Sequence, residues 1–325
     1  MKKDSAKDIK IAFFDVDGTL VDMEKKVITP AMIETLKHLK KNGIILCMAT
    51  GRGPYLVPSF PGIDFDVFLS YNASYCYTKD EVIFSNPIPK EDVKAIVENA
   101  SEIHRPVFLA GVEGGGANGC DKDLADYFAI AKSKVNVLDN FDFEKLMDKK
   151  VYQMMVGCYK EEYADILRDV DGARITAWWT RAADITPANG NKGVGVRKIL
   201  DYYHLDKENA IAFGDGTNDI EMLEAVGTGV AMGNAQDKVK QAADYVTLSH
   251  NEDGVANVIN KFMTPASKKK ENGKYQLDLW KANEIVLLDA GVLPEHIEIT
   301  DICTCCNPDL LFSHRASHGK RGNLG

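Results

Sequence analysis

Two aspartates directly follow a short apolar run near the start of the chain. Residues 11–20 read IAFFDVDGTL, so Asp15 and Asp17 stand one residue apart where a buried strand is expected to end. Active sites of open α/β sheets lie at the carboxyl ends of their strands. Two carboxylates at positions i and i+2 can share one site while taking different roles in acid–base chemistry. Taken alone, the same pattern could also be an ordinary acidic loop.

Three later segments place polar residues at the ends of similar elements. Residues 44–52 (IILCMATGR) and 210–219 (AIAFGDGTND) each read as an apolar strand with a polar end. Residues 189–195 (NGNKGVG) read as the start of a helix. The polar and glycine residues that these segments contribute are Thr50, Gly51, Arg52, Lys192, Asp215, Asn218 and Asp219.

In order, spacing and chemistry the four segments resemble the four motifs of the haloacid dehalogenase-like phosphohydrolases, and among them the Cof-type family. The resemblance runs from about residue 9 to about residue 262. It implies an α/β fold with a doubly wound, Rossmann-like parallel-sheet core and an α+β cap domain inserted between the second and third motifs. Four motifs in order are far harder to match by chance than one, so the acidic-loop interpretation loses its support.

The resemblance implies a phosphoric monoester hydrolase that works through an aspartyl-phosphate. A phosphate dianion repels anionic nucleophiles, so the reaction needs positive charge around the phosphoryl oxygens, an aligned nucleophile and a proton donor. By family pattern Asp15 attacks phosphorus, and Asp17 protonates the leaving oxygen and then deprotonates the attacking water. The implied cofactor is Mg²⁺, with Asp15, the backbone carbonyl of Asp17 and Asp215 as ligands and Asp219 in support.

The same resemblance assigns further residues to the phosphoryl group and the substrate. The Thr50 hydroxyl and the Lys192 ammonium would hold phosphoryl oxygens, and Gly18 would let backbone amides approach them. Arg52 could contact the substrate or the cap, or form a surface salt bridge. Where such proteins carry Asn-Gly-Ala, residues 72–74 of this chain read Asn-Ala-Ser. The full set expected at the phosphate and substrate is Gly18, Thr50, Gly51, Arg52, Asn72, Asn191, Lys192 and Asn218.

The alternation of strand-like and helix-like segments changes between about residue 74 and residue 185. We therefore expect a core over residues 1–84 and 186–264, a cap over 85–185 and a linker over 265–274. The glycine-rich residues 111–119 (GVEGGGANG) lack the lysine and the strand-to-helix context of a phosphate loop, which predicts a flexible cap loop or a substrate-sensing loop. Sheltering an aspartyl-phosphate favours a cap that closes, with hinges near residues 85–87 and 186–190.

Residues from about 275 to 325 resemble the C-terminal end of the laccase-like, YfiH-type proteins, which are linked to polyphenol oxidation and purine nucleoside phosphorolysis. The matching stretches are DLWKAN, CTCCNPDLLFSHR and GKRG. The segments that carry that family's metal ligands have no counterpart, and one more apolar strand would be expected. We therefore expect a truncated, inactive fragment with one helix over residues 281–290. Its Cys303, Cys305, Cys306, His314 and His318 do not have the spacing of a zinc finger, and structural zinc stays an alternative.

Charge, hydropathy and cysteine content limit the partners and the compartment that we expect for this protein. The 325-residue chain carries a formal net charge of −9, which disfavours nucleic acid and anionic membranes. The sequence contains no run of about 18 apolar residues, so no membrane-spanning helix is expected. An odd count of seven cysteines, without a secretory signal, favours the reducing cytoplasm.

The combined prediction is a cytoplasmic, Mg²⁺-dependent phosphatase of a small phosphorylated metabolite, such as a sugar phosphate, a nucleotide or pyridoxal phosphate. The sequence does not set the oligomeric state. Two alternatives stay open. One is a non-catalytic protein that binds or senses a phosphorylated metabolite, and the other is a bifunctional fusion whose tail acts on purine nucleosides or phenols.

Overall fold

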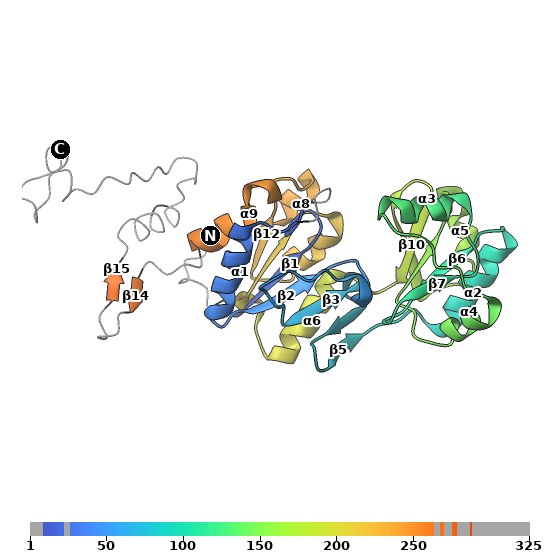
Figure 1. The fold of residues 1–325 in the computed structure, drawn as a ribbon, viewed down its shortest axis with the longest axis horizontal. Helices are drawn as coiled ribbons and strands as arrows, with labels where there is room; N and C mark the ends of the chain where they lie inside the picture. Colours follow the sequence, from blue (N-terminus) through green and yellow to red (C-terminus); the bar gives the residue numbers. More distant parts are fainter. Residues whose placement is uncertain (1–8, 23–26, 263–266, 270–274, 278–286, 288–325) are drawn as a thin grey trace, which may run out of the picture. The chain divides into compact units, whose positions relative to one another are not determined.

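The computed structural model describes residues 9–22, 27–262, 267–269, 275–277 and 287. The chain divides into one unit over residues 1–260 and a second over residues 261–325. Within the first unit the strands form two separate sheets (Figure 1). In the part of the chain that is described, no helix combines the length and the apolar character needed to cross a membrane.

The larger sheet has eight strands in the order β13-β12-β11-β1-β2-β3-β4-β5. Neighbours from β13 to β3 run parallel, and β4 and β5 extend the sheet as an antiparallel hairpin. The parallel order with β1 in its middle confirms the predicted fold class. The strands are β1 (Ile11–Asp15), β2 (Ile45–Ala49), β3 (Val67–Ser70), β4 (Tyr75–Tyr77), β5 (Val82–Ser85), β11 (Ala210–Gly214), β12 (Thr228–Ala231) and β13 (Tyr245–Val246).

Helices cover both faces of this sheet. On one face α6 (Lys192–Tyr203), α7 (Ile220–Glu224) and α8 (Asp237–Ala242) contribute to a buried cluster that also contains Ile11 and Phe13 of β1. The helices α1 (Pro30–Lys41) and α9 (Gly254–Phe262) lie side by side (Figure 1). The hydroxyl of Thr29, the N-cap of α1, donates to Asp253, which directly precedes α9, at 2.5 Å. Side chains alternate between the faces of a strand. Asp15 therefore continues the row of Ile11 and Phe13 and lies on the α6 side.

The smaller sheet has five antiparallel strands in the order β7-β6-β8-β10-β9. Helices α2, α4 and α5 share a buried cluster with one of its faces, whereas α3 packs on Phe108 and its neighbours. The elements are α2 (Lys90–Glu102), β6 (Val107–Ala110), β7 (Gly115–Ala117), α3 (Lys122–Ile130), α4 (Asn140–Met147), β8 (Gln153–Val156), α5 (Tyr163–Ile166), β9 (Ala173–Trp179) and β10 (Ala182–Pro187).

Part of the glycine-rich segment is a strand, so its prediction as a loop was wrong there. Residues Gly115–Ala117 form β7, which pairs with β6. A Cβ on Gly115 would overlap the carbonyl oxygen of Leu109 and the ring of Phe108, and one on Gly116 would overlap Leu138. The glycines therefore let β7 approach closely, which outweighs their low strand propensity.

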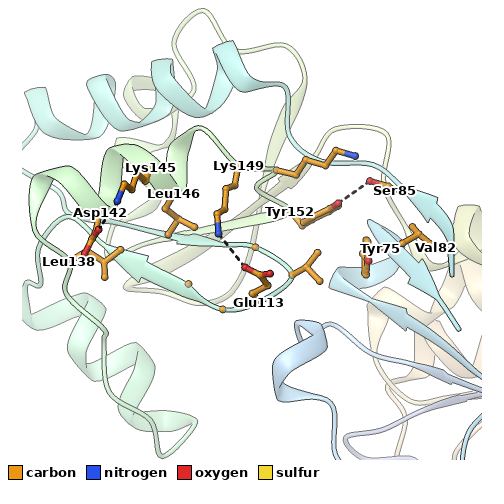
Figure 2. A pocket seen from close by; sticks show the side chains of 15 residues that line it. Tyr75, Val82, Ser85, Glu113, Leu138, Asp142, Lys145, Leu146, Lys149 and Tyr152 are labelled. Carbon is orange, nitrogen blue, oxygen red and sulfur yellow. Dashed lines mark hydrogen bonds and ion pairs between the residues drawn. The ribbon is translucent and has the colours of Figure 1, made fainter. Parts of the chain in front are cut away.

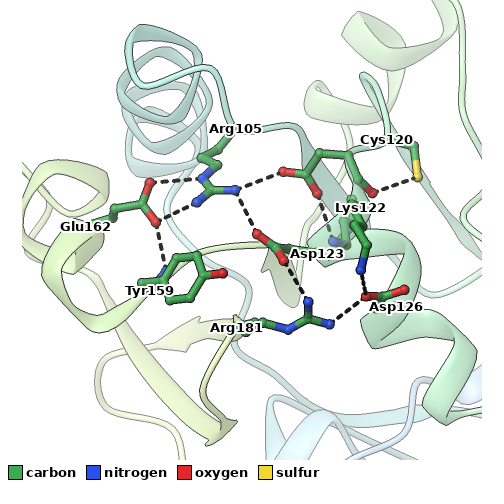
Figure 3. A network of polar contacts seen from close by, with 10 residues as sticks. Arg105, Cys120, Lys122, Asp123, Asp126, Tyr159, Glu162 and Arg181 are labelled. Atoms are coloured by element: carbon green, nitrogen blue, oxygen red, sulfur yellow. Dashed lines mark hydrogen bonds and ion pairs between the residues drawn. The ribbon is translucent and has the colours of Figure 1, made fainter.

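A network of ion pairs ties the ends of several elements of the smaller sheet together (Figure 3). Arg105 donates from two nitrogens to Glu162, at 2.9 and 2.8 Å, and from the third to Asp121 and Asp123. Arg181, in the turn between β9 and β10, pairs with Asp123 and Asp126. These arginines hold α3 and the segment before α5 against the sheet.

The predicted domain boundaries stay predictions, because residues 1–260 form one compact unit. Strand β10 extends to Pro187, two residues past the predicted cap boundary. In the second unit β14 (Ser267–Lys269) pairs with β15 (Tyr275–Leu277), so part of the predicted linker is a strand. The predicted tail helix, except Leu287, and the tail cysteines and histidines lie outside the described residues.

Candidate active site

The ammonium of Lys192 lies between two buried carboxylates at the carboxyl edge of the larger sheet. Its Nζ donates to Asp15 Oδ1 at 2.6 Å and to Asp219 Oδ1 at 2.5 Å. Lys192 and Asp219 have no exposed surface and Asp15 is 7% exposed. A charged lysine is almost never fully buried without a partner. This arrangement therefore brings together three residues that are far apart in the sequence and that were all predicted at the site.

Strand register explains why these groups meet. β1 and β11 are parallel neighbours with Phe14 opposite Phe213, so Asp15 and Asp215 leave the sheet one position apart. Gly18 has φ +91°, and a Cβ there would overlap the Asp215 carboxylate. Asp215 is further held by the Thr19 hydroxyl, which donates at 3.2 Å. The chain after β1 therefore turns back against the end of β11, and the glycine at residue 18 leaves room for the Asp215 carboxylate.

Asp15, Asp215 and Asp219 each offer an oxygen, and these oxygens lie within 4.8 Å of one another. Three carboxylates thus face one ammonium. Burial, and then Asp219, raise the pKa of Asp15 well above its usual value, although Lys192 opposes them. Burial likewise raises the pKa of Asp215 to about 6. The cluster has three carboxylates and one ammonium, and its carboxylate oxygens are the ligands that Mg²⁺ prefers.

Lys192 and Asp219 are held in place on both sides. Burial lowers the pKa of Lys192, but Asp15 and Asp219 outweigh it and raise the pKa overall. The second oxygen of Asp219 accepts from the backbone amides of Asp215 and Gly216, at 3.1 and 2.9 Å. Both Asp219 oxygens are therefore engaged by the protein, which suits the supporting role expected of it.

Arg52 forms a partly exposed salt bridge, one of the two roles left open for it, and its partner is Asp17, which was not foreseen. Its Nε donates to Asp17 Oδ2 at 2.9 Å and its Nη2 to Asp17 Oδ1 at 2.5 Å. Both side chains are about one third exposed or less, at 28% and 30%. Two parallel bonds of this kind fix the orientation of a carboxylate. The predicted acid–base residue is thus held by the predicted substrate-side arginine.

The segment after β2 meets the segment after β3. The buried Thr50 accepts from the backbone amide of Arg52 through its hydroxyl, at 3.2 Å. The carbonyl of Thr50 accepts from the amide of Asn72, and a Cβ on Gly51 would lie 3.2 Å from the Asn72 amide nitrogen. Asn218 donates to Asn72 at 2.9 Å. These five predicted residues, Thr50, Gly51, Arg52, Asn72 and Asn218, therefore form one continuous rim.

Asn191 is the N-cap of α6 rather than a residue with a free side chain. Its Oδ1 accepts from the backbone amide of Val194 at 2.9 Å, an end geometry that stabilises helices. The cap fixes the first turn of α6 and with it the starting point of Lys192. A contact between Asn191 and phosphate stays a prediction.

Sequence reasoning missed Thr19 and Asn234. Asn234 donates to the Gly18 carbonyl at 2.9 Å and to Asp215 at 3.1 Å. It follows β12, in AMGNA, and a polar residue after a parallel strand was a usable signal. A cavity of about 750 Å³, in contrast, contains none of the predicted site residues, since Gly111, Leu138, Lys149 and Tyr152 are among the residues that line it (Figure 2).

The family described as haloacid dehalogenase-like hydrolase matches residues 12–259. The chain belongs to this family. This match confirms the resemblance to the haloacid dehalogenase-like hydrolases that the sequence motifs predicted. YkrA of Bacillus subtilis (strain 168), provisionally named a phosphatase, is 33% identical over 254 residues, which are 77% of this chain and 96% of that protein. The 5-amino-6-(5-phospho-D-ribitylamino)uracil phosphatase YitU of the same strain is 31% identical over 265 residues, 77% of this chain and 96% of YitU.

Solved structures agree with this assignment. BT1666 of Bacteroides thetaiotaomicron, described among phosphatases of the haloalkanoate enzyme superfamily, has a TM-score of 0.73 and 30% identity, and the match covers 81% of this chain and 98% of that one. The sugar phosphatase BT4131, of subclass IIB, has a TM-score of 0.68 and 30% identity over 78% of this chain and 99% of its own. The predicted enzyme class, a phosphoric monoester hydrolase, agrees with the names of these relatives.

A second family, described as multi-copper polyphenol oxidoreductase laccase, matches residues 231–325. This confirms the predicted likeness of the C-terminal end. The match begins well before residue 275, so it overlaps β13 and α9 of the hydrolase-like part. In that shared stretch the observed strands and helices belong to the first unit.

Proposed function

We propose that this protein is a Mg²⁺-dependent phosphatase that transfers the phosphoryl group of a small metabolite ester to Asp15 and then to water. The observation that carries the proposal is the buried Lys192 ammonium 2.6 Å from Asp15, beside two further carboxylates. Excess carboxylate at a cation site, together with a fixed ammonium, suits the binding of a metal–phosphate pair. The mechanism and the residue roles below are part of the proposal.

The Lys192 ammonium and the Thr50 hydroxyl bind phosphoryl oxygens and orient phosphorus toward Asp15. Asp15 attacks, and the bond from phosphorus to the ester oxygen breaks. Asp17 delivers a proton to that leaving oxygen and later accepts one from the water that attacks the aspartyl-phosphate. Mg²⁺, held by Asp15, Asp215 and the Asp17 carbonyl, would neutralise the charge of the phosphate dianion.

Arg52 has to release Asp17 before Asp17 can reach the leaving oxygen. An arriving phosphate ester supplies a competing anion for the guanidinium, which binds phosphate and carboxylate in the same two-pronged geometry. Substrate binding would then replace the Arg52–Asp17 pair and free the acid. This step links substrate recognition to proton transfer.

The names of the relatives guide the choice of substrate. YitU is named for a phosphate ester of a ribityl chain and BT4131 for sugar phosphates. We propose a phosphate ester of a small polyhydroxylated metabolite. Pyridoxal phosphate and nucleotides, which the sequence also suggested, belong in the same test.

The test is a substrate panel with and without metal. The full chain is assayed for phosphate release from sugar phosphates, ribityl phosphate esters, nucleotides and pyridoxal phosphate. EDTA should stop release, and Mg²⁺ added in excess should restore it. A matched control, Asp142→Asn, changes an exposed carboxylate of α4 and should leave release unchanged. Undiminished turnover in chelator would refute the metal role, and no release from any ester would refute the phosphatase.

A further inference from the structure

Three consecutive residues behind the site adopt a backbone conformation that side chains rarely allow. Tyr71, Asn72 and Ala73 have φ values of 52°, 51° and 79°. Left-handed backbone is unfavourable for residues with a Cβ, and it persists only where the surroundings impose it. Ala73, at φ 79°, also carries a Cβ, so all three residues are strained in this conformation. Something must therefore hold this segment.

Tyr71 is the side chain that holds it. The residue is 1% exposed, and its hydroxyl donates to the carbonyl of Gly111 at 2.7 Å. Its ring stacks on Tyr152, with centroids 5.8 Å apart and planes 2° apart. Gly111 follows β6 and Tyr152 precedes β8, so both partners belong to the smaller sheet. A residue of the larger sheet is thus anchored in the smaller one.

The backbone of the same segment carries the rim of the site. The Tyr71 amide donates to the Arg52 carbonyl at 3.0 Å, and the Asn72 amide donates to the Thr50 carbonyl at 3.1 Å. The side chain of Asn72 accepts from Asn218. Tyr71, which is anchored in the smaller sheet, is therefore the direct neighbour in sequence of Asn72, which belongs to the rim.

Tyr152 joins this contact to the connection between the sheets. Its hydroxyl lies 2.9 Å from that of Ser85, at the end of β5 and beside one predicted hinge (Figure 2). Tyr75 packs edge-on against Tyr152 at 5.2 Å. A movement of the smaller sheet would therefore displace Gly111 from Tyr71 and Tyr152 from Ser85 at the same time.

We propose that Tyr71 is a positioning residue that couples the smaller sheet to the rim of the site, which is formed by Thr50, Gly51, Arg52, Asn72 and Asn218. The inference rests on the proposed phosphatase function. When the smaller sheet lies as observed, the bond to Gly111 keeps residues 71–73 left-handed and Asn72 on Asn218. When the smaller sheet moves away, this bond breaks and the rim relaxes. Esters whose leaving group reaches the cap then lose binding.

The test variant is Tyr71→Phe, which keeps the ring on Tyr152 and removes the donor to Gly111. The Tyr71 hydroxyl also lies near that of Tyr55, so Tyr55→Phe is the matched control that keeps the Gly111 bond. For the metabolite ester chosen from the panel, Tyr71→Phe should lower kcat/KM about 5–10-fold, the effect of about one hydrogen bond, mainly through KM. For acetyl phosphate, whose leaving group is small, the loss should stay within about twofold. Tyr55→Phe should match the wild type on both.

Amide hydrogen exchange separates this coupling from a purely structural role. In Tyr71→Phe, exchange should accelerate both at residues 111–117 and at residues 71–73, while α2 should not change. Equal losses on both substrates, or faster exchange throughout the protein, would overturn the proposal. Unchanged exchange in both segments would also overturn it. If the wild type hydrolyses no ester, the phosphatase proposal fails, and the exchange result still decides the coupling.

Discussion

Two clusters of charge in this molecule contain similar residues and have opposite electrostatic character. At the carboxyl edge of the larger sheet, three carboxylates share the Lys192 ammonium, and the pKa values of Asp15 and Asp215 are raised. In the Arg105 network of the smaller sheet, four carboxylates are paired with three cations, Arg105, Arg181 and Lys122, and each carboxylate contacts at least one of them. There the pKa values of Glu162 and Asp126 are lowered.

The difference distinguishes a binding site from a structural brace. The site is the cluster of Asp15, Lys192, Asp215 and Asp219, and the brace is the Arg105 network. A cluster that is satisfied by the protein's own groups stabilises the fold and needs nothing more. A buried cluster with surplus negative charge costs folding free energy, and a ligand that supplies positive charge recovers it. The direction of the carboxylate pKa shifts therefore distinguishes the two clusters more sharply than residue type or burial.

The largest expected effect comes from removing the predicted nucleophile. Asp15→Asn should lower kcat by more than about 10³-fold, because an amide is a far weaker nucleophile toward phosphorus than a carboxylate. The protein should stay folded, since the change removes one of three crowded carboxylates. Steady-state kinetics on the best ester of the panel and a thermal melt check both parts. Near-normal turnover would show that Asp15 is not the nucleophile and that its cluster is not the catalytic site.

The brace should respond in the opposite way. Arg105 is 17% exposed, and replacing it with Met leaves Glu162, Asp121 and Asp123 without their shared partner. We expect a loss of about 2 kcal/mol in unfolding free energy, less than for a fully buried pair. Below the melting temperature, kcat/KM should be unchanged. Urea unfolding measures this, with Lys149→Met, from an exposed pair, as a control of about zero. Lost activity without lost stability would place the network in the site.

The raised pKa of Asp215 predicts a pH dependence of stability in the metal-free protein. The folded pKa of about 6 lies above the unfolded value, so the folded state binds the proton more tightly. This stability is fully present below about pH 4 and is lost as the pH rises through about 6. For a partly exposed carboxyl we expect about 1–2 kcal/mol. Melts of the wild type and Asp215→Asn across pH 4–8 measure the difference.

The sign is fixed by the comparison. Asp215→Asn should be the more stable protein at pH 7, by an amount that shrinks toward pH 4. Added Mg²⁺ should reverse the order, because the wild type alone keeps the full ligand set. A difference that grows as the pH falls would show that Asp215 is paired like the carboxylates of the brace.

The smallest effect concerns the C-terminal part of the chain. Both charge clusters are built from residues before 261, so ending the chain after Thr264 should leave kcat/KM within a few-fold of the full-length value. The full-length protein should show no copper-dependent oxidation of phenols and no phosphorolysis of adenosine. A collapse of phosphatase activity on truncation would place a needed contact in residues 265–325.

The sequence predicted those parts of the site that depend on local pattern. Asp15, Asp215 and Lys192 follow apolar strands or open a helix, and parallel strands bring such positions to one edge. The Arg52–Asp17 pair could not be predicted, since it depends on side-chain directions across two strands. Asn191 was expected at phosphate, yet its position before α6 is equally that of an N-cap.

Glycine was the least predictable residue in the fold. At Gly18 the motif predicted backbone amides close to phosphate, whereas the observed feature is a left-handed turn against the Asp215 carboxylate. At Gly115 and Gly116 the same residue type forms an edge strand, which only its neighbours Phe108 and Leu138 explain. Close packing against another element leaves no local pattern in the sequence.

The central claim is that Asp15 carries the phosphoryl group, and the most direct test is to trap it there. In Asp17→Asn the water that attacks the aspartyl-phosphate lacks its base, whereas acetyl phosphate needs little acid assistance to transfer its phosphoryl group. Mixing this variant with acetyl phosphate and Mg²⁺, quenching in acid and measuring the peptide masses should show one added phosphoryl group on the peptide that contains Asp15. The double variant Asp15→Asn, Asp17→Asn should show none. A phosphoryl group on another residue, or wild-type turnover with no labelled peptide in the variant, would contradict the account.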